Sequence, residues 1–367
     1  MDSTPPPSTP PEPSPVPRGR PAHPPAGGGA SPGEASAGPE LGPLFGIEEA
    51  CTSLELLAGG HIHETYLATY AGGDRWIHQR LNTSVFTDVE LLMDNVVRVT
   101  AHLGGPVVVR PAPDGRPFAR DAAGAAWRTL AFVDGARAGA RFDRPEQAVE
   151  GAALAAAFVA GLADLEPPPP EVIAGFHDVV ARLGHLEAAR DADDVGRAAD
   201  CAPEVDAVLD HAGVAIEVAD ARAAGVLPER TVHNDAKVEN LLFDAATGAG
   251  VCMVDLDTVG PGTVLFDVGD LVRSGAVRAA EDGDAAGLRV DPGIVAAILD
   301  GYAAAGFLTP GEAGLLPLAG PLMALEAAAR FLTDYLRGDV YFRVQDPGHN
   351  RRRARNQLAA LELLLAG

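Results

Sequence analysis

A short run of polar and charged residues, set against two apolar runs, constrains the fold of this chain more than any other feature. The apolar runs at residues 240–243 and 251–254 flank a turn at 245–250, and this pattern predicts a β-hairpin. Asp235 lies just before the first predicted strand, and Asp255 follows the second. Because the free ends of a hairpin are adjacent, we expect both carboxylates at one rim.

The residue types at this rim have the chemistry of phosphoryl transfer. Kinase-like sites combine an acid that holds the acceptor hydroxyl, an amide and a carboxylate for Mg²⁺, and a cation for the moving phosphate. Asp235 suits the first role, and Lys237 beside it suits the last. Asn240 and Asp255 are then the expected metal ligands. Polar loop residues are usually only solvated, but these lie between two strands that are expected to be buried.

The first 43 residues differ in composition from the rest of the chain. They are rich in Pro and Gly, and Phe45 is the first aromatic residue. A segment with so few large apolar groups does not offset the entropy cost of ordering, so we predict that residues 1–43 are disordered. The segment also lacks the cationic start and continuous apolar core of a secretory signal.

The net charge limits the class of partner. A formal net charge of −23 works against binding to a nucleic-acid backbone, because proteins that read nucleic acids present a basic face. The charge does not exclude ATP, whose phosphates are neutralised locally by Mg²⁺ and a few cations.

The cysteines and apolar runs point to a cytoplasmic protein. Three scattered cysteines argue against a disulfide framework and favour a reducing compartment. The apolar run at residues 152–162 is too short to span a bilayer. We therefore expect a cytoplasmic monomer that binds a small molecule, with no nucleic-acid or membrane partner.

The segment after the tail has the pattern of a nucleotide-covering hairpin with a third strand behind it. Strands are predicted at residues 54–57, 66–70 and 76–81, with a glycine turn between the first two. Gly59 and Gly60 in this turn allow backbone N–H groups to approach phosphate oxygens, so we assign them to nucleotide binding.

The third predicted strand carries the expected phosphate cation. Arg80 lies at its end, where kinase-like lobes hold the α- and β-phosphates. Thr87 and Glu90 have the spacing of a capping box at the start of a helix with an apolar face. On that helix, Glu90 or Asp94 is the candidate partner of Arg80.

Two further strands, at residues 107–110 and 127–133, are predicted to complete the first lobe. The backbone near Phe132 and Asp134 is placed to meet adenine at the junction with the rest of the chain. The predicted divisions are a disordered tail at 1–43, a nucleotide-binding lobe at 44–134, and a catalytic and substrate-binding lobe at 135–367.

Beyond residue 135 most of the chain is predicted to be helical, which together with the strands predicts the α+β class. A helix is expected near Asp267, and Asp267 and Asp270 are expected to hold the catalytic loop rather than to touch substrate. The other predicted helices lie at residues 146–165, 172–183, 203–224, 292–305, 310–336 and 351–366.

Four stretches of sequence carry a resemblance to a known family. They are GHIHETY (60–66), QRLNTSVF (79–86), HNDAKVEN with VDLDTVGPG (233–240 and 254–262), and RFLTDYLRGDVYF (330–342). Together they resemble the aminoglycoside phosphotransferase branch of the protein-kinase-like fold, and within it the N-acetylhexosamine 1-kinases. The third stretch is shared by the wider kinase-like group, whereas the fourth is more specific to the sugar 1-kinases.

This resemblance implies a bilobal fold with a small antiparallel β lobe and a mostly helical second lobe. It also implies ATP- and Mg²⁺-dependent transfer of the γ-phosphoryl group to the anomeric C1 hydroxyl of GlcNAc or GalNAc. By matching position, Asp235 is the base, and Asn240 and Asp255 bind the metal. The positions matched to the sugar are His61, Asp235, Arg330 and Tyr341.

Some positions depart from the family pattern, so other acceptors stay open. Ala58 stands where the loop usually has its first glycine, and His63 stands where Asn is common. The main alternative is a kinase for another hydroxyl acceptor, such as an amino sugar, an aminoglycoside or a choline-like alcohol. A nucleotide-binding pseudokinase is a further alternative, against which the intact acid, amide and carboxylate at the rim argue.

Overall fold

The computed structural model describes residues 40–57, 62–279, 283 and 285–367 of the 367-residue chain. Most of the predicted disordered tail therefore lies outside the described residues. The end of this tail, from residue 40, is described, and Leu41 is buried and packs with Phe45 and Trp127. The short 3-10 helix η1 (Pro43–Phe45) places Phe45 in this cluster.

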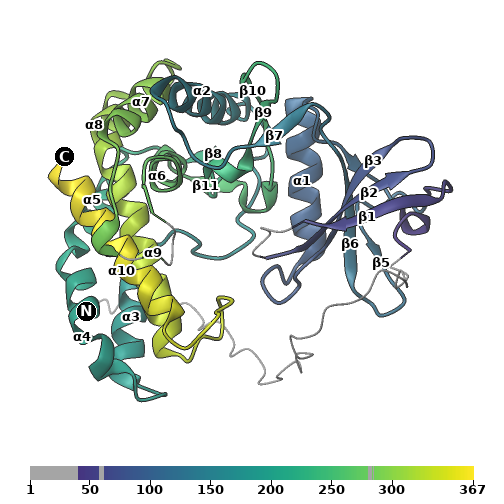
Figure 1. Cartoon of the computed structure of the whole chain (residues 1–367). Coiled ribbons are helices and arrows are strands. Elements are labelled where there is room, and N and C mark those ends of the chain that lie inside the picture. The colour runs from purple at the N-terminus through teal and green to yellow at the C-terminus, as the bar shows by residue number, and fades with distance from the viewer. Residues whose placement is uncertain (1–39, 58–61, 280–282, 284) are drawn as a thin grey trace, which may run out of the picture. The chain divides into compact units, whose positions relative to one another are not determined.

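An antiparallel sheet of six strands forms the first part of the described chain (Figure 1). Its order is β1-β2-β3-β6-β4, and β5 pairs with β6. The five strands expected here from the sequence are confirmed with shifted ends, and β5 is an addition to them. The strands are β1 (Cys51–Leu56), β2 (Glu64–Tyr70), β3 (Arg75–Arg80), β4 (Val109–Arg110), β5 (Ala119–Arg120) and β6 (Ala126–Ala131).

Helix α1 (Val89–Leu103) lies alongside this sheet and packs against β4 (Figure 1). Asp88 caps its first turn, because the Asp88 side chain accepts a hydrogen bond from the backbone N–H of Leu91 (2.9 Å). The predicted cap at Thr87 is therefore wrong by one residue. The apolar face of α1 is buried as expected, through Val89, Leu92, Met93, Val96 and Val99.

Tyr70, His78 and Thr129 form a buried polar chain on the sheet face that Phe45 covers. Tyr70 Oη lies 3.0 Å from His78 Nε2, and His78 Nδ1 lies 2.7 Å from Thr129 Oγ1. The Phe45 ring centre is 6.0 Å from that of His78. Burial, together with the nearby Arg110 cation, lowers the pKa of His78 to about 4. The imidazole is therefore neutral in the folded protein at neutral pH.

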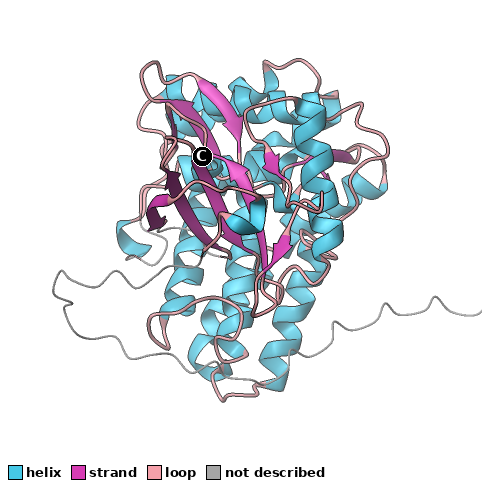
Figure 2. Cartoon of the chain, turned by 90° about the vertical axis from the view of Figure 1, so that its right-hand side faces the viewer, coloured by secondary structure: helices cyan, strands magenta, loops and turns pink. Residues whose placement is uncertain are grey.

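After residue 144 the described chain is mostly helical, as predicted, and Figure 2 shows helices in cyan around the remaining strands. Helix α9 is central, since it packs against α3, α4, α6 and α10. Gly269 lets α6 approach α9, because a Cβ at this position would lie 2.3 Å from the Ala319 carbonyl oxygen. The helices are α2 (Pro145–Gly161), α3 (Val179–Ala192), α4 (Ala198–Asp210), α5 (Ala212–Ala223), α6 (Val264–Gly275), α7 (Pro292–Ala303), α8 (Pro310–Leu315), α9 (Ala319–Leu336) and α10 (His349–Ala366).

One helical run among the described residues, Pro310–Leu336, is long and apolar enough to cross a membrane by length and composition. However, 72% of its apolar window is buried inside the protein. Core helices of folded proteins pass the same test, so this run is a weak indication of a membrane span. Its apolar character matches the position of α9 at the centre of the helical part.

Two helix predictions are wrong in detail. Helix α3 begins at Val179 rather than at residue 172, because the Asp178 side chain caps it by accepting a backbone N–H of the first turn (2.9 Å). The segment predicted as one helix at 203–224 is two helices, α4 and α5. They are separated at His211, whose ψ of 8° leaves the helical range.

The central hairpin is confirmed as β9 paired with β10. A third strand, β7, pairs with β9, and β8 pairs with β11. The backbone N–H of Val254 donates to the Asn240 carbonyl oxygen (2.9 Å), which joins the two polar segments at the rim. The strands are β7 (Ala136–Ala138), β8 (Arg230–Val232), β9 (Leu241–Asp244), β10 (Gly250–Met253) and β11 (Gly260–Gly262).

We expect the stability of this protein to decrease between pH 6.5 and pH 4 because of His78. An unfolded histidine titrates near 6.5, whereas the folded pKa is about 4, so the unfolded chain takes up the proton first as the pH falls. This group leaves the free energy of unfolding unchanged above pH 6.5 and lowers it by up to about 3 kcal/mol as the pH falls through 4. Urea unfolding at a series of pH values measures the slope.

The control uses a second histidine. His78→Gln keeps a neutral polar side chain in the buried chain and should flatten the slope between pH 6.5 and 4. His102→Gln, on the partly exposed end of α1, makes the same change of side chain at a histidine outside the buried chain and serves for comparison. An unchanged slope in the His78 variant contradicts the assignment.

Candidate functional site

One buried carboxylate holds the start of the segment 233–240. The two oxygens of Asp267, on α6, accept the backbone N–H groups of His233 (3.0 Å) and Asn234 (2.8 Å). Burial raises the pKa of Asp267 to about 7. Asn234 has a φ of 62°, a left-handed conformation that Asn adopts more readily than most residues. Asp267 therefore fixes the turn that aims Asp235, as predicted.

Asp235, Lys237 and Asn240 meet at the rim, as predicted. Asp235 Oδ2 lies 2.5 Å from Lys237 Nζ and accepts a hydrogen bond from Asn240 Nδ2 (2.9 Å). Asn240 Nδ2 also donates to the Asp235 carbonyl oxygen (2.8 Å). Burial opposes ionisation of Asp235, but the Lys237 ammonium outweighs it and holds the pKa of Asp235 below its usual range. Asp235 Oδ1 has no hydrogen-bond partner among the described residues.

Asp255 follows β10 and lies near two other carboxylates. Its φ of 63° is again left-handed. Burial, followed by repulsion from Asp257 and Asp235, raises the pKa of Asp255. Within the described part of the chain, its carboxylate has no hydrogen-bond or ion-pair partner. A carboxylate in these surroundings is suited to receive a cation.

The donor set at the rim fits a metal that arrives with a substrate. Mg²⁺ is commonly held by one or two carboxylates together with substrate phosphates, and Asn240 and Asp255 supply such oxygens. No group of three or more His, Cys, Asp and Glu side chains suited to hold a metal ion occurs among the described residues. The residues present therefore fit a nucleotide-bound Mg²⁺ better than a metal held by the protein alone.

His177 connects the turn at residues 233–235, called here the catalytic turn because it carries Asp235, to α9. Its Nε2 lies 2.8 Å from the Asn234 carbonyl oxygen, and its Nδ1 lies 2.7 Å from Glu326 Oε2. A carbonyl oxygen only accepts, so Nε2 donates to it. Burial opposes a charge on the ring, but Glu326 outweighs it and raises the pKa of His177. An imidazolium held between two acceptors thus supports the turn before Asp235.

A pocket of about 130 Å³ opens beside this turn. Asp270 lines this pocket, and its side chain pairs with Arg273 (3.1 Å). The expectation that the Asp270 side chain holds the catalytic turn is therefore wrong. Glu326 lies 3.6 Å from Arg330 and also binds His177. Each of these carboxylates therefore has a cation of its own. The apolar lining consists of Phe176, Met323, Ala327, Phe331 and Phe342.

The predicted acceptor residues Arg330 and Tyr341 lie together. The guanidinium carbon of Arg330 is 5.9 Å from the Tyr341 ring centre and 5.4 Å from that of Phe176. Arg330 lines the pocket, whereas Tyr341 is 54% exposed. Arg330 is therefore the more direct candidate for contact with a molecule in the pocket.

Asp334 fixes the segment that carries Tyr341. Its Oδ1 accepts the N–H groups of Val340 (2.9 Å) and Tyr341 (2.8 Å). Its Oδ2 accepts from the N–H of Phe342 (2.9 Å) and from Asn350 Nδ2 (2.8 Å). Four donors on one buried carboxylate define the main-chain path of a segment without regular secondary structure.

Arg80 lies on the wrong face of the sheet for the expected phosphate contact. The register places it opposite Glu64, and its guanidinium lies 3.3 Å from Glu64 Oε1. Gln79, on the other face, accepts a hydrogen bond from Arg128 Nε (2.8 Å). Arg128 in turn pairs with Asp257, two residues after Asp255 in the chain. The period of two separates the faces of a strand, but it does not tell which face meets the site.

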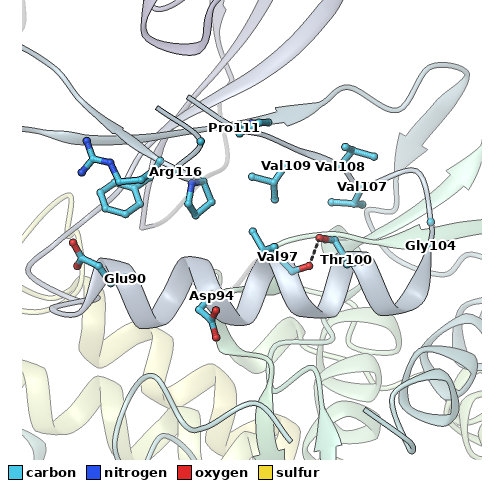
Figure 3. Close-up of a pocket in the computed structure, with 15 residues that line it drawn as sticks. Glu90, Asp94, Val97, Thr100, Gly104, Val107, Val108, Val109, Pro111 and Arg116 are labelled. Carbon is cyan, nitrogen blue, oxygen red and sulfur yellow. Dashed lines mark hydrogen bonds between the residues drawn. The ribbon is translucent and has the colours of Figure 1, made fainter. Parts of the chain in front are cut away.

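Glu90 is not the partner of Arg80 either. It lies with Asp94 along a groove of about 790 Å³ between α1 and residues 104–118 (Figure 3). Asp94 lies 4.0 Å from Arg98, on the next turn of α1. None of the residues that line this groove also lines the pocket beside Asp235. The remaining lining is mainly apolar: Val97, Val107, Val108, Val109, Pro111, Pro117 and Phe118.

Phe132 and Asp134 lie where the chain leaves the sheet. Arg75 contacts both, since its guanidinium carbon is 4.3 Å from the Phe132 ring centre and the same group pairs with Asp134. The Gly135 carbonyl oxygen accepts the N–H of Ala245 (2.8 Å), which ties this junction to the central hairpin. Both side chains are therefore engaged by Arg75, and the contact of the backbone here with adenine stays a prediction.

Three predicted residues, Gly59, Gly60 and His61, lie outside the described residues, so their roles stay predictions. Their neighbour His63 is described and buried, and its Nε2 lies 2.5 Å from Asp257 Oδ2. His63, which departs from the family pattern, therefore makes a buried contact to the segment that follows Asp255.

Three buried residues near the site have no role in the sequence analysis: Arg128, Asp257 and His177. Arg128 is a lone charge within the apolar strand predicted at 127–133, and such a charge is a usable signal. Asp257 repeats the carboxylate of Asp255 two residues later, which is a second signal. His177 has no local signal, because its two partners are 57 and 149 residues away in the chain.

Comparisons with known proteins agree with this geometry. A model of the phosphotransferase enzyme family (APH) matches residues 53–318. An aminoglycoside phosphotransferase structure from Alicyclobacillus acidocaldarius has 15% sequence identity and a TM-score of 0.60, and the match covers 86% of this chain and 91% of the other. An amicoumacin kinase solved with AMP-PNP and Ca²⁺ has 15% identity and a TM-score of 0.58, with 87% and 91% covered.

A choline kinase structure from Streptococcus pneumoniae is also similar. It has 13% identity and a TM-score of 0.56, and the match covers 89% of this chain and 98% of the other. At such low identities the structures show a shared fold and nothing about the acceptor. They confirm the predicted kinase-like α+β fold.

We expect Asn234→Ala to be less stable than Asn234→Gly. Both variants lose the hydrogen bond from Asn234 Nδ2 to the Thr258 carbonyl oxygen (3.0 Å). Only the Ala variant must also place an L-residue at a φ near 62°, which costs about 1–2 kcal/mol. Urea unfolding should therefore give the Ala variant the lower free energy of unfolding by about 1 kcal/mol.

Asn95 provides a matched control with the opposite expected order. Its Nδ2 also donates to a backbone carbonyl, that of Pro170 (2.8 Å), but it lies in helix α1. In a helix Ala is favoured over Gly by about 1 kcal/mol, so Asn95→Ala should be the more stable variant there. The same order at both positions would refute the role given to the left-handed turn.

Proposed function

This chain belongs to the phosphotransferase enzyme family, and we propose that it transfers the γ-phosphoryl group of ATP to a hydroxyl group of a small molecule. The contacts of Asp235 carry the proposal. Lys237 Nζ at 2.5 Å and Asn240 Nδ2 at 2.9 Å meet its Oδ2. Asp255 follows Val254, whose N–H donates to the Asn240 carbonyl oxygen (2.9 Å), and its charge is close enough to interact with that of Asp235. A carboxylate, a cation and metal-binding oxygens at one point are what positioning and charge stabilisation of this transfer require.

Asp235 orients and deprotonates the acceptor. Lys237 and Asn240 engage Oδ2, so Oδ1 is the oxygen left to accept a hydrogen bond from the acceptor hydroxyl. The lowered pKa keeps Asp235 ionised at neutral pH, as a base must be. The hydroxyl proton passes to Oδ1 while the acceptor oxygen bonds to the γ-phosphorus and the bond to the β-phosphate oxygen breaks.

Lys237 and the metal ligands meet the charge of the phosphates. Burial opposes the charge on Lys237, but Asp235 and Asp255 outweigh it and raise its pKa, so the ammonium persists. Asn240 and Asp255 would hold Mg²⁺, which when bound neutralises charge on the phosphate oxygens. The absence of an ion-pair partner for Asp255 among the described residues supports this role.

The remaining nucleotide contacts follow the sequence expectations, apart from Arg80 and its expected partner Glu90, which lies along the separate groove beside α1. Gly59 and Gly60 would offer backbone N–H groups to the phosphates, and the backbone near Phe132 and Asp134 would meet adenine. Arg80 is left out of the proposal, since it lies on the opposite face of β3 from Gln79.

The charges of the acceptor pocket favour a neutral acceptor over a polycation. Asp270 and Glu326 are each paired with an arginine, and Glu326 also accepts from His177. Each of these carboxylates thus already has a cation beside it, which weakens its attraction for the ammonium groups of an aminoglycoside. Arg182 donates to the carbonyl oxygen of Phe176, a residue of the pocket wall (3.1 Å), and burial and the nearby Arg330 lower the pKa of Arg182.

Within this class we infer an N-acetylhexosamine that is phosphorylated at its anomeric C1 hydroxyl. Arg330 can donate to hydroxyl and acetamido oxygens, and the rings of Phe176 and Phe342 offer apolar surface to a pyranose face. The choice of C1 rests on the resemblance of residues 330–342 to the sugar 1-kinases. An amine-bearing alcohol is the competing acceptor, because the similar structures include an aminoglycoside phosphotransferase and a choline kinase.

Phosphorus NMR tests the reaction directly. The protein is incubated with ATP and Mg²⁺ and, in separate tubes, with GlcNAc, GalNAc, glucose, glucosamine, choline and kanamycin. A sugar 1-phosphate formed from the N-acetylated sugars supports the full proposal. Phosphocholine or a phosphorylated aminoglycoside instead overturns the sugar assignment and keeps the kinase. No product with any of these acceptors argues against both assignments of acceptor.

Asp235→Asn should reduce kcat by about 10²–10⁴. The amide oxygen of Asn can accept the hydrogen bond of the hydroxyl but not its proton, so chemistry is lost while nucleotide binding is retained. A coupled assay measures turnover, and calorimetry measures the binding of ATP.

Asp244→Asn is the matched control. Asp244 is the last residue of β9, and its carboxylate accepts from the N–H and hydroxyl groups of Thr247 in the following turn (2.7 and 2.8 Å). This variant should turn over like the wild type. A wild-type kcat in the Asp235 variant would remove Asp235 from the mechanism.

Arg330→Gln should raise KM for the acceptor by about tenfold or more, because a hydrogen bond from a charged donor contributes about 1.5–3 kcal/mol. KM for ATP should be unchanged, since Arg330 lines the acceptor pocket. Arg190→Gln, at an arginine of α3 that pairs with Asp191, should change neither constant. An equal rise in both KM values for the Arg330 variant contradicts its placement on the acceptor side.

A further inference from the structure

A buried charged cluster between the sheet and the segment after Asp255 has no role in the mechanism given above. Arg128 on β6 and Asp257 in the 3-10 turn η3 (Leu256–Thr258) have side chains that are 1% and 3% exposed. Arg128 Nη1 and Nη2 donate to the two oxygens of Asp257, with Nη2 at 2.9 Å from Oδ2. This is the bidentate geometry that fixes direction as well as distance.

His63 adds a third donor to the same carboxylate. Its Nε2 lies 2.5 Å from Asp257 Oδ2, while its Nδ1 lies 3.0 Å from the backbone N of Asn82. A backbone N–H can only donate, so Nδ1 is the acceptor and Nε2 carries the hydrogen that is donated to Asp257. The tautomer of His63 is therefore fixed by its surroundings.

The cluster is anchored in three strands of the sheet. Arg128 Nε donates to Gln79 Oε1 on β3 (2.8 Å), and Gln79 Nε2 donates to Thr65 Oγ1 on β2 (3.1 Å). The register pairs Gln79 with both Thr65 and Arg128, so the three side chains lie on one face of the sheet. Asp257 is thus held by a rigid sheet rather than by a single flexible side chain.

Stability alone does not account for such a cluster. Taking an arginine and a carboxylate out of water is costly, and an apolar pair of similar volume is often as stable or more stable. The location of the cluster suggests a different reason. Asp255, two residues before Asp257, has a left-handed φ of 63°, a conformation that persists only when its surroundings hold it. Val254 fixes the segment on one side through its bond to the Asn240 carbonyl oxygen (2.9 Å).

We propose that Arg128 and His63 are positioning residues which, by holding Asp257, set the Asp255 carboxylate for the Mg²⁺ of the nucleotide. This inference rests on the proposed function and names how one of its metal ligands is held in place. It also assigns a role to Arg128, the cation on the face of the sheet that meets Asp257. In place of a phosphate contact from Arg80, the sheet contributes Arg128, which acts on the metal ligand through Asp257.

Calorimetry on the full chain tests the proposal without relying on turnover. Titrations with ATP plus Mg²⁺ and with ATP plus EDTA are compared for the wild type, Arg128→Lys and Asp257→Asn. Arg128→Lys keeps the charge but loses the bidentate contact. Both variants should bind Mg²⁺–ATP about 10–100-fold more weakly, while metal-free ATP binds as in the wild type, since residues that orient metal ligands typically contribute this factor.

Glu204→Gln is the matched control for a buried carboxylate held by arginine. Glu204 on α4 accepts from Arg351 (2.9 Å) and Arg355 (2.6 Å) of α10, and it lines neither pocket. This variant should bind both forms of the nucleotide like the wild type. A double variant, Arg128→Met with Asp257→Leu, separates an effect on folding from an effect on positioning. It should keep a cooperative thermal transition by circular dichroism, because an apolar pair can replace a buried ion pair. It should still bind Mg²⁺–ATP weakly.

The possible outcomes are distinguishable. If the wild type binds no nucleotide with Mg²⁺, the proposed function fails and this inference fails with it. If the wild type binds and the Arg128 and Asp257 variants match it, only the positioning role is overturned. Equal weakening of Mg²⁺–ATP and metal-free ATP also overturns it, because Arg128 would then act on the nucleotide itself. Selective weakening with Mg²⁺ supports the proposal.

Discussion

Two left-handed residues, Asn234 and Asp255, impose the constraint on which the rest of the site depends. Such a backbone is unfavourable for L-residues, so each turn persists only because buried hydrogen bonds hold the chain on either side. Asp267 accepts the two N–H groups at the first turn. The bond from Val254 to the Asn240 carbonyl oxygen joins the first segment to the second (2.9 Å). These main-chain contacts bring Asp235 and Asp255 to the same rim.

The carboxylates at the site differ in whether a partner balances their charge. Three carboxylates near the turn at residues 233–235 are matched by cations: Asp235 by Lys237, Asp270 by Arg273, and Glu326 by His177 and Arg330. Asp267 instead accepts the backbone N–H groups of His233 and Asn234. Asp255 has neither kind of partner among the described residues, and its raised pKa reflects burial and two like charges nearby. Its carboxylate is therefore left for the cation that the proposed function places there.

Local patterns in the sequence were sufficient for the hairpin and the rim but not for the choice of strand face. Apolar runs and a turn define β9 and β10 locally, so the meeting of Asp235, Lys237 and Asn240 at one rim could be predicted from them. Arg80 was misassigned because the face of β3 that it shares with His78 is covered by Phe45, a contact that no local pattern reveals. The start of α3 was misplaced because Asp178 caps the helix, while His177 just before it bonds to Asn234 and Glu326, far away in the chain. Pairings of this kind depend on tertiary packing, which overrides local propensity.

The hydrogen bonds that Asp334 accepts from the segment after α9 affect how this fold can change its substrate. Three of its four donors are main-chain N–H groups, at Val340, Tyr341 and Phe342, so the path of the segment does not depend on the identity of those side chains. Side chains at the edge of the pocket can therefore be exchanged while the backbone that presents them stays in place. A scaffold with this property separates the evolution of acceptor choice from that of catalysis, since the proposed base and metal ligands lie on other elements of the fold.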